Sequence, residues 1–408
     1  GKAVMEKLLT VLVAQYRPDP AALRRTLASL VMQDTREFAV ALADDGSPQP
    51  YFAESRAWLA SGGVTDVTAV AMAQNGGTVR NILNAAQAVQ TRWVLTLSPG
   101  DYLYDAGTVS WWLERLRADA PRAAFAKQAY YTPGPAPAPA PGETPFDRAP
   151  YDPAQYDGGA VKRNLLLFDD GISGCGMVYE RDLLVQALQT MAGHVRLAED
   201  FAVRLFAVQG VPIRRYDRVA TWYEYGGGVS TDGAARQRMA QEWRAMVELL
   251  HRQYPRDRTV RLAYAYFFND RHKSRLVRGL VGRLIVPQNH PFKKAQHAWQ
   301  PPVNGDAAKL RAIYAAAGRM PAADEGERGS YFSGIFWEQG DKNCALPGPG
   351  WTAACWRRYR WRRWPVCCWP TVLRLPTCSP TMTARSLYSM HSGPCMCWAA
   401  GRRTCIFR

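Results

Sequence analysis

The stretch that decides the fold reads Phe38-Ala39-Val40-Ala41-Leu42-Ala43-Asp44-Asp45-Gly46-Ser47-Pro48. Its first six residues are apolar and suit a strand that is buried on both faces of a parallel sheet. Two carboxylates, a glycine and a serine follow at once, so the strand ends in a tight turn with acidic side chains. Ligands of open α/β sheets bind at the carboxyl ends of the strands. This turn is therefore a candidate site edge, and an ordinary capped turn is the alternative.

Strand and helix patterns alternate around this stretch. Hydrophobic spacing predicts strands over Leu8–Gln15, Val64–Ala71 and Trp93–Leu97, and helices over Pro20–Met32, Tyr51–Ala60 and Thr78–Val89. Asp19 before Pro20 is a good N-cap. Such alternation predicts an α/β fold with a Rossmann-like nucleotide-binding layer. The first strand is followed by no glycine-rich loop and no Walker loop occurs elsewhere, which argues against a dehydrogenase or a P-loop enzyme.

Composition narrows the class of protein. The chain has 408 residues, a formal net charge of +16 and hydrophobic content typical of a soluble protein. Residues 344–408 hold ten Arg and no Lys, Asp or Glu, and segment 270–299 holds seven Lys or Arg and one Asp, so the rest is nearly neutral. This distribution argues against a nucleic-acid partner. With no recognisable leader or spanning segment, we expect a cytoplasmic protein in which Cys175 is a reduced core residue.

A family resemblance rests on four motifs in order. They are Tyr16 after the first strand, Ser29-Leu30-Val31-Met32-Gln33, Asp44-Asp45-Gly46-Ser47, and Asn75-Gly76-Gly77 followed by Asn81. Together they resemble the family 2 glycosyltransferases, which have the GT-A fold. Arg17 departs from the asparagine that is usual there. The resemblance implies a mixed sheet and nucleotide-sugar contacts by a set of polar side chains: Tyr16 (stacking on the base), Asp45 (accepting from a base nitrogen), Asp44, Asn75 and Arg80.

The metal-binding segment of that family is altered here. Leu95–Leu103 lies where the Leu-Asp-x-Asp-Asp segment is expected, with Ser98 and Gly100 in place of two acids, so that Asp101 alone remains. The resemblance implies Asp101 as the ligand of Mn²⁺ or Mg²⁺. Because the phosphates of a nucleotide supply further oxygens, one carboxylate and water can complete an octahedral shell, with weaker affinity. The alternative is that Asp101 begins a helix.

The second half holds the candidate base. Leu197-Ala198-Glu199-Asp200-Phe201 opens a predicted helix, and the resemblance implies Asp200 as the base that deprotonates the acceptor hydroxyl in an inverting displacement. The alternative is that Glu199 and Asp200 only favour a helix N-terminus. The small residues of Ile172–Tyr179 would leave room for an acceptor sugar. Gly226-Gly227-Gly228 before Ser230 is predicted to be a flexible segment that closes over the diphosphate or a plain turn.

We divide the chain into five segments. These are residues 1–130 (nucleotide-sugar half), 131–160 (Pro-rich loop), 161–255 (acceptor and catalytic half), 256–342 (helical basic extension) and 343–408 (tail). The Pro-Ala repeat Pro135–Pro141 predicts an extended surface loop. The basic amphipathic run Ser274–Val286 either lies on an anionic membrane or packs on the catalytic domain.

The predicted function is transfer of a sugar from a nucleoside diphosphate, best a uridine diphosphate sugar, to a saccharide or lipid-linked acceptor in cell-surface polysaccharide biosynthesis. The enzyme would be cytoplasmic, with peripheral contact to the inner face of the membrane. One alternative is a catalytically weakened homologue that acts as a scaffold or subunit of an assembly complex, because two metal-binding acids are lost. A sugar nucleotidyltransferase is disfavoured because it should show a Gly-rich signature with a paired Arg and Lys near its first strand.

The tail from about Asn343 onward has a different composition. Eight of the nine cysteines lie there, beside ten Arg and no acidic residue. Two Cys-x-x-Cys knuckles are lacking, which argues against zinc. The rise in Arg, Cys, Trp and Pro is typical of a GC-rich gene translated out of frame. We therefore expect a frameshift near Lys342 to Cys344 and a tail without a packed core.

Overall fold

The structure is a computed structural model that describes residues 7–142, 145, 147–168, 170–225, 233–268 and 303–321. The chain divides into two units, Gly1–Ser333 and Gly334–Arg408, and all described residues belong to the first. Three sequence-based expectations lie outside the described residues: the glycine-rich segment 226–230, the basic run 274–286 and the tail 343–408.

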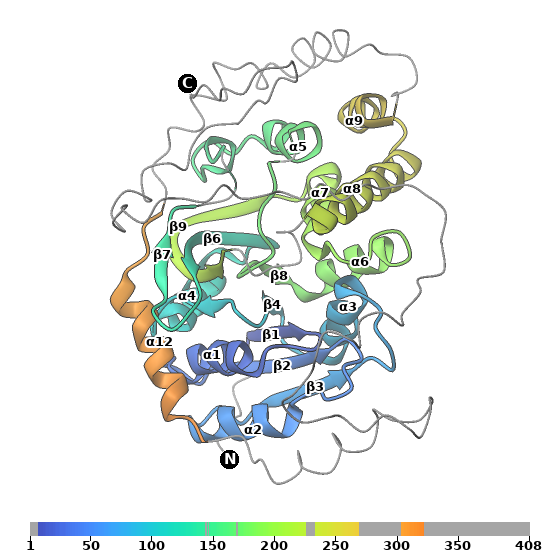
Figure 1. The fold of residues 1–408 in the computed structure, drawn as a ribbon. Helices are drawn as coiled ribbons and strands as arrows, with labels where there is room; N and C mark the ends of the chain where they lie inside the picture. The colour runs from blue at the N-terminus through green and yellow to red at the C-terminus, as the bar shows by residue number, and fades with distance from the viewer. Residues whose placement is uncertain are drawn as a thin grey trace, which may run out of the picture. The chain divides into compact units, whose positions relative to one another are not determined.

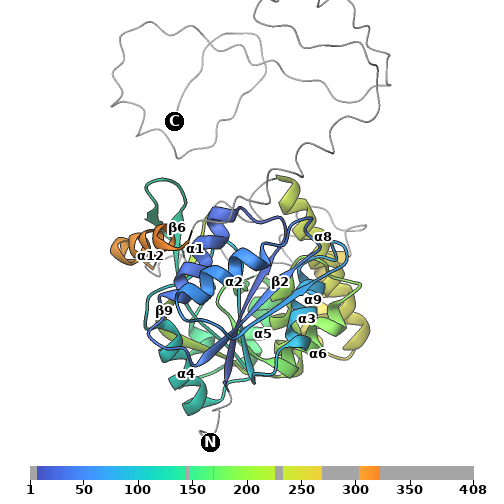
Figure 2. The same ribbon diagram turned by 90° about the horizontal axis from the view of Figure 1, so that it is seen from below.

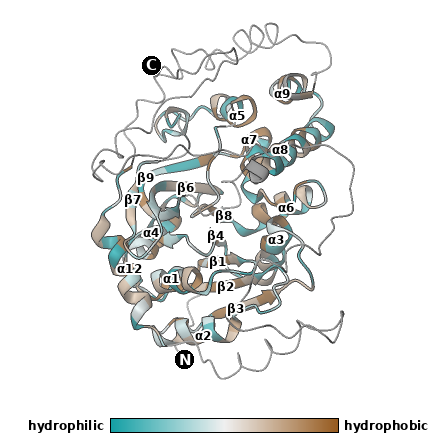
Figure 3. Cartoon of the chain, viewed as in Figure 1, coloured by the Kyte–Doolittle hydropathy of each residue, from teal (hydrophilic) through white to brown (hydrophobic). Residues whose placement is uncertain are grey.

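Four parallel strands form the first part of the sheet. They are β1 (Leu9–Gln15), β2 (Phe38–Asp44), β3 (Val67–Ala71) and β4 (Trp93–Leu97), in the order β3-β2-β1-β4. β1 and β4 are buried at every position, and Figure 3 shows the apolar character of these strands. Continuous apolar runs form strands here because both sheet faces are covered. The Rossmann-like layer predicted from the sequence is confirmed.

Helices α1 (Pro20–Val31), α2 (Phe52–Ser61) and α3 (Thr78–Ala88) connect these strands. Helix α1 begins as predicted, because the Asp19 carboxylate accepts hydrogen bonds from Ala21 N at 3.3 Å and Ala22 N at 3.1 Å. The parallel register of β1 and β2 brings Gln15 opposite Asp44. The turns that follow the two strands therefore meet at one edge of the sheet.

The second part of the chain extends the same sheet. Strands β8 (Val178–Glu180), β6 (Ala123–Thr132), β9 (Ile213–Glu224) and β5 (Tyr102–Leu103) continue the order beyond β4. β8 is antiparallel to β4, and β9 is parallel to β6 with a register shift near Lys127. The sheet is mixed, so the predicted fold class is confirmed. β9 lies near the other end of this strand order, and its last residues reach the edge of the sheet where Asp101 lies.

Two hydrophobic cores cover the two faces of the sheet. One face is covered by α3, α5, α6, α7, α8 and α9, and the other by α1, α2, α4 and α12 (Figures 1 and 2). The helices not yet given bounds are α4 (Thr108–Asp119), α5 (Gly158–Leu167), α6 (Arg181–Met191), α7 (Ala202–Gln209), α8 (Gly233–Gln253), α9 (Arg258–Phe268) and α12 (Ala307–Arg319). Short 3₁₀ helices lie at Ala149–Tyr151 and Glu199–Phe201. In the described part of the chain no helix is long and apolar enough to cross a bilayer.

The Pro-Ala repeat is more ordered than a loop. Residues Ala138–Ala140 form strand β7, which pairs antiparallel with the end of β6 at Tyr130 to Thr132. The extended conformation expected from the repeat is present, but over these three residues it belongs to a strand. Proline is tolerated because β7 pairs along one side with β6.

Helix α12 packs against α1, as Figures 1 and 2 show. Its Leu310 and Ile313 share a hydrophobic cluster with Tyr102, Tyr131 and Trp222. Polar contacts add to this packing, because Trp58 Nε1 donates to Pro321 O at 3.0 Å and Lys309 pairs with Asp105 at 2.6 Å. A segment far along the chain thus completes the core behind β5 and β9.

Candidate functional site

The turns after β1 and β2 join at the carboxyl edge of the sheet. Arg17 N donates to Ser47 Oγ at 2.7 Å, and the Arg17 guanidinium lies 5.3 Å from the centre of the Tyr16 ring. The ring of Tyr16 is 43% exposed, which is high for a large aromatic residue. Tyr16 therefore presents a face on which a planar group could stack.

Asp44 is fully buried below this turn. Its Oδ2 accepts a hydrogen bond from Ser47 N at 2.6 Å, while its Oδ1 has no partner among the residues that the structure describes. Gly46 makes the turn possible, because its φ is +75° and a Cβ there would lie 2.6 Å from the carbonyl carbon of Gln74.

Asp45 holds the loop before α3. Its Oδ1 accepts from Gly76 N at 2.7 Å, and its Oδ2 accepts from Gly77 N at 2.9 Å and from Asn75 Nδ2 at 3.0 Å. Asn75 also accepts a hydrogen bond from Arg196 through its side-chain oxygen. Asp45 and Asn75 thus form one hydrogen-bonded unit, and a nucleotide base would have to share the Asp45 carboxylate with these three donors.

Arg80 lies beside this loop. Its side chain is exposed, and its Cβ and Cδ pass 3.4 Å from the position that a Cβ on Gly76 would take. Together with Tyr16, Asp44, Asp45 and Asn75, it completes the five residues predicted for the nucleotide. They come from the ends of β1 and β2 and from the start of α3, which the parallel sheet brings to one edge.

Asp101 lies in the turn between β4 and β5. Asp101 N donates to Ser98 O at 2.9 Å, and strand β5 begins at the next residue, so the alternative that Asp101 begins a helix is wrong. Only 8% of the residue is exposed. Burial raises the pKa of Asp101 to about 7 and the charge of Glu224 adds to the rise, against hydrogen bonds from Glu224 N and the Cys175 thiol.

Glu199 and Asp200 lie against the small-residue turn before β8. A Cβ on Gly174 would come within 2.6 Å of Glu199 Oε1 and 3.2 Å of Asp200 Cβ. Burial and the charges of Asp200 and Asp101 raise the pKa of Glu199 to about 8. Thr96 of β4 fixes the same turn by donating to Gly174 O at 2.8 Å. The structure therefore brings the base and metal-ligand candidates to one turn.

Two acidic residues that the sequence analysis missed complete this arrangement. Glu224 ends β9, and its Oε2 would lie 2.5 Å from a Cβ on Gly100, so the missing side chain at Gly100 makes room for this carboxylate. Glu242 of α8 accepts hydrogen bonds from Arg196 N at 2.7 Å and Leu197 N at 2.9 Å. Neither residue belongs to a local motif, although Glu224 follows the aromatic run of β9.

The acidic side chains do not form a complete metal cage. In the described ranges no group of three or more His, Cys, Asp or Glu side chains has the arrangement of a metal site. Asp101 and Glu224 are oxygen ligands of the type that Mg²⁺ and Mn²⁺ prefer, and Mg²⁺ sites commonly use one or two carboxylates with substrate phosphates. The donor set therefore fits an ion that is completed by a nucleotide and water.

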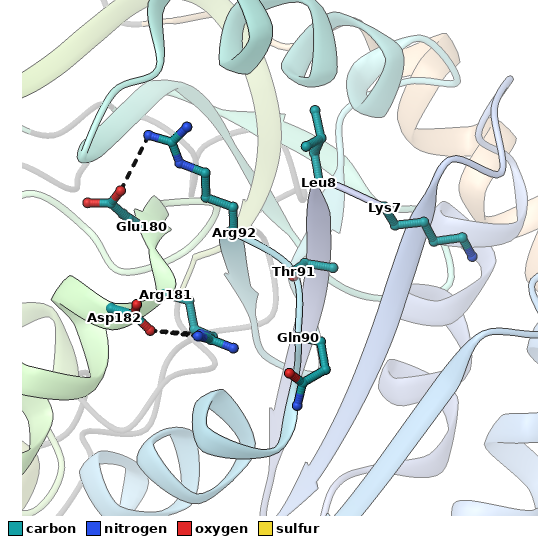
Figure 4. A pocket seen from close by; sticks show the side chains of 8 residues that line it. All are labelled: Lys7, Leu8, Gln90, Thr91, Arg92, Glu180, Arg181 and Asp182. Atoms are coloured by element: carbon teal, nitrogen blue, oxygen red, sulfur yellow. Dashed lines mark hydrogen bonds and ion pairs between the residues drawn. The ribbon is translucent and has the colours of Figure 1, made fainter. Parts of the chain in front are cut away.

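A pocket of about 420 Å³ lies at the opposite end of the sheet (Figure 4). Its lining includes the residues before β1 and β4 and the start of α6. The charges there are paired: Arg92 Nη2 lies 3.4 Å from Glu180 Oε1, and Arg181 Nη2 lies 2.8 Å from Asp182 Oδ1. Since it lies away from the carboxyl ends of β1 and β4, this pocket is separate from the candidate site.

A family model matches the first part of the chain. Residues 10–164 match the model of glycosyl transferase family 2. The resemblance inferred from the sequence is therefore confirmed. No curated protein sequence matches the chain.

Several solved structures are similar to this chain. S. aureus TarS shares 15% identity at a TM-score of 0.42, over 76% of this chain and 55% of that chain. Residues 1–349 of TarS in complex with UDP-GlcNAc share 16% identity at a TM-score of 0.42, over 76% of this chain and 91% of that chain. The mannosyltransferase PcManGT from Pyrobaculum calidifontis, in complex with GDP-Man and Mn2+, shares 14% identity at a TM-score of 0.41, over 76% of this chain and 85% of that chain. The chain spans about half of the length of the first of these.

Proposed function

We propose that the chain is an inverting glycosyltransferase that moves a sugar from a nucleoside diphosphate to an acceptor hydroxyl. One observation carries the proposal: in a chain whose residues 10–164 match the family 2 model, the carboxylates of Asp101, Glu199, Asp200 and Glu224 gather around two small-residue turns beside the turns after β1 and β2. This arrangement supports nucleotide binding at the turns after β1 and β2. It supports sugar transfer at the part of the site that holds the four carboxylates, which we call the acidic edge.

Asp200 would act as the general base. Its carboxylate takes the proton of the acceptor hydroxyl while that oxygen forms a bond to the anomeric carbon. The bond between the anomeric carbon and the phosphate oxygen breaks, and the nucleoside diphosphate leaves with the electron pair. Glu242 supports this role, because it holds Arg196 and Leu197 just ahead of the base.

Asp101 and Glu224 would hold a divalent ion, Mn²⁺ or Mg²⁺, together with the diphosphate. When bound, the ion would stabilise the negative charge of the departing diphosphate. The raised pKa of Asp101 makes the two carboxylates costly to ionise together without a cation. A cation at this position would remove that cost, and its binding should release a proton near neutral pH.

The nucleotide would bind along the turns after β1 and β2. Tyr16 offers an exposed ring for stacking on the base, and Asp44 keeps one oxygen without a partner among the described residues. The five nucleotide-contact residues inferred from the sequence remain predictions, as does the preference for a uridine diphosphate sugar. The saccharide or lipid-linked acceptor and the peripheral, cytoplasmic location are likewise proposals.

A scaffold role is the second candidate, and the replacement of two metal-binding acids by Ser98 and Gly100 favours it. The two roles differ in their need for Asp200. We therefore compare Asp200→Asn with Asp182→Asn, whose exposed carboxylate lies at the pocket on the opposite end of the sheet.

For an enzyme, Asp200→Asn should lower transfer or donor hydrolysis by about 10²- to 10⁴-fold and leave nucleoside diphosphate binding within about twofold. Asp182→Asn should change neither property. Turnover is measured with a panel of sugar nucleotides and Mn²⁺, and binding by calorimetry. Substantial transfer by Asp200→Asn removes the residue from the base role, and nucleotide binding without turnover of any donor by the unsubstituted chain favours the scaffold.

A further inference from the structure

The hydroxyl of Tyr131 lies between three parts of the candidate site. Tyr131 belongs to β6 and is fully buried. Its hydroxyl oxygen lies 2.5 Å from Gly100 O, 2.7 Å from the Tyr102 hydroxyl and 3.2 Å from Glu224 Oε2. One side chain therefore contacts the turn before Asp101, the strand after it and the carboxylate at the end of β9.

The donors and acceptors give this network a direction. The Tyr131 hydroxyl donates toward the Tyr102 hydroxyl, and Arg25 Nε donates to the same Tyr102 oxygen at 3.0 Å, so Tyr102 accepts from both sides. Gly100 O and Glu224 Oε2 are the other acceptors of the Tyr131 hydroxyl, and the three acceptors share its single proton.

The turn before Asp101 is held from two sides. From α1, Thr26 Oγ1 accepts from Gly100 N at 3.0 Å and donates to Ser98 O at 3.4 Å. From β6, Tyr131 donates to Gly100 O. Gly100 has φ +104°, a conformation that glycine adopts readily and other residues rarely do, so the hydrogen bonds act on a backbone that only glycine allows here.

We propose that Tyr131 is a positioning residue for the acidic edge of the site. Through its hydroxyl it fixes the carbonyl of Gly100 and the carboxylate of Glu224, and thereby the separation of Glu224 from Asp101. This inference rests on the proposed function, in which these two carboxylates hold the metal–diphosphate group. Tyr131 is itself fully buried and acts through these two groups.

Helix α12 encloses the same network. The ring of Tyr314 lies 6.3 Å from that of Tyr102 in an edge-on arrangement, and the guanidinium of Arg25 lies 4.8 Å from the Tyr314 ring. The network is thus shielded from water on the side of α12, where hydrogen bonds between buried groups are stronger. Helix α12 therefore contributes to the surroundings of this network through Tyr314.

The hydroxyl can be removed without removing the ring. The Tyr131 ring packs 5.2 Å from that of Tyr102 and 6.3 Å from that of Trp222, and phenylalanine would keep both contacts. Tyr216→Phe is the matched control. Tyr216 lies on β9 far from Glu224, is buried, and donates through its hydroxyl to Asp119 Oδ2 at 2.8 Å.

The experiment compares Tyr131→Phe with Tyr216→Phe by two readouts. The first is amide hydrogen exchange over residues 98–103, which should become about tenfold faster in Tyr131→Phe alone. The second is calorimetric binding of uridine diphosphate with Mn²⁺ and of uridine without metal. Tyr131→Phe should weaken the first ligand about tenfold and leave uridine unchanged, whereas Tyr216→Phe should bind both as the unsubstituted chain does.

The outcomes separate this inference from the proposed function. Unchanged exchange in Tyr131→Phe, or equal changes in the two variants, overturns the positioning role. Unchanged binding of the metal–diphosphate ligand overturns it as well, and so does an equal loss of uridine binding. If the unsubstituted chain binds no nucleotide with Mn²⁺, the proposed function fails, and hydrogen exchange still decides whether Tyr131 fixes the turn.

Discussion

Two acids at the same edge of the sheet are held in opposite ways. Asp45 receives three protein hydrogen bonds from the loop before α3. Asp101 is buried close to Glu224 and its pKa is raised to about 7. The Asp45 carboxylate is thus held by three donors of the protein itself, whereas Asp101 is buried close to a second carboxylate. The surroundings of Asp45 consist mainly of backbone donors from one loop, whereas the surroundings of Asp101 consist of side chains from distant segments.

The largest effect is expected on the nucleotide-side turns. Gly46→Ala puts a Cβ 2.6 Å from the backbone of Gln74 at φ +75°, and should lower the free energy of unfolding by about 3 kcal/mol or more. Gly210→Ala is the control, because Gly210 has φ +73° and its added Cβ would meet no atom within 4 Å among the residues that the structure describes, and it should cost only about 1 kcal/mol. Urea denaturation measures both. Equal losses would show that backbone strain, not the contact with Gln74, makes glycine necessary there.

The next effect concerns the acidic edge. Because the folded-state pKa of Glu199 is raised to about 8, folding takes up a proton, and stability is lost as the pH rises from about 4.5 towards 8. Glu199→Gln removes this loss. We expect the variant to gain on the order of 2 kcal/mol over the unsubstituted chain between pH 5 and pH 8, without metal.

Urea denaturation at several pH values measures this difference. Glu180→Gln is the control, because Glu180 pairs with Arg92 and Arg122 and should show no growing gain over this range. Parallel stability curves for Glu199→Gln and the unsubstituted chain would mean that ionisation of Glu199 costs the folded chain no stability over this pH range.

A smaller effect tests how α12 is attached. Burial opposes ionisation of Asp105, but Lys309 and Arg218 together lower its pKa below the ordinary value of 3.8. The ion pair of Lys309 with Asp105 therefore stabilises the folded chain at neutral pH, and this stabilisation is lost as the pH falls through the folded-state pKa of Asp105. Lys309→Met should lower the free energy of unfolding by about 0.5–1 kcal/mol at pH 7, with a shrinking difference below pH 4.

The matched control for that variant is Lys127→Met. Lys127 pairs with Asp217 at 2.7 Å, and Asp217 is largely exposed, so the loss should be smaller. A pH-independent cost of Lys309→Met would assign the effect to its contact with the Tyr104 ring rather than to the charge of Asp105.

The smallest effect is expected from the tail. Truncation after Lys342 should leave the melting temperature and nucleotide binding unchanged, because we expect residues 343–408 to be translated out of frame. The melting temperature and calorimetric binding of the two chains measure this. Sequencing of independent clones through the codons for Lys342 to Cys344 tests the origin, and an intact frame together with lost binding on truncation would contradict the hypothesis.

The sequence by itself determined the Rossmann-like layer and the candidate residues in its turns. Strands β1, β2 and β4 and helix α1 follow from continuous apolar runs, helical spacing and the Asp19 cap, all of which act over short distances along the chain. The turn of Asp44 to Ser47 was visible for the same reason.

Only the tertiary structure decided which side chains meet at the acidic edge. Glu224 reaches Gly100 because β9 pairs with β5 and β6, and Tyr131 contacts Gly100 because β6 lies beside β9. Helix α12 encloses these contacts although it follows β9 by more than eighty residues. Hydrogen bonds and burial between distant segments leave no periodicity in the sequence, since each depends on the packing of the whole sheet.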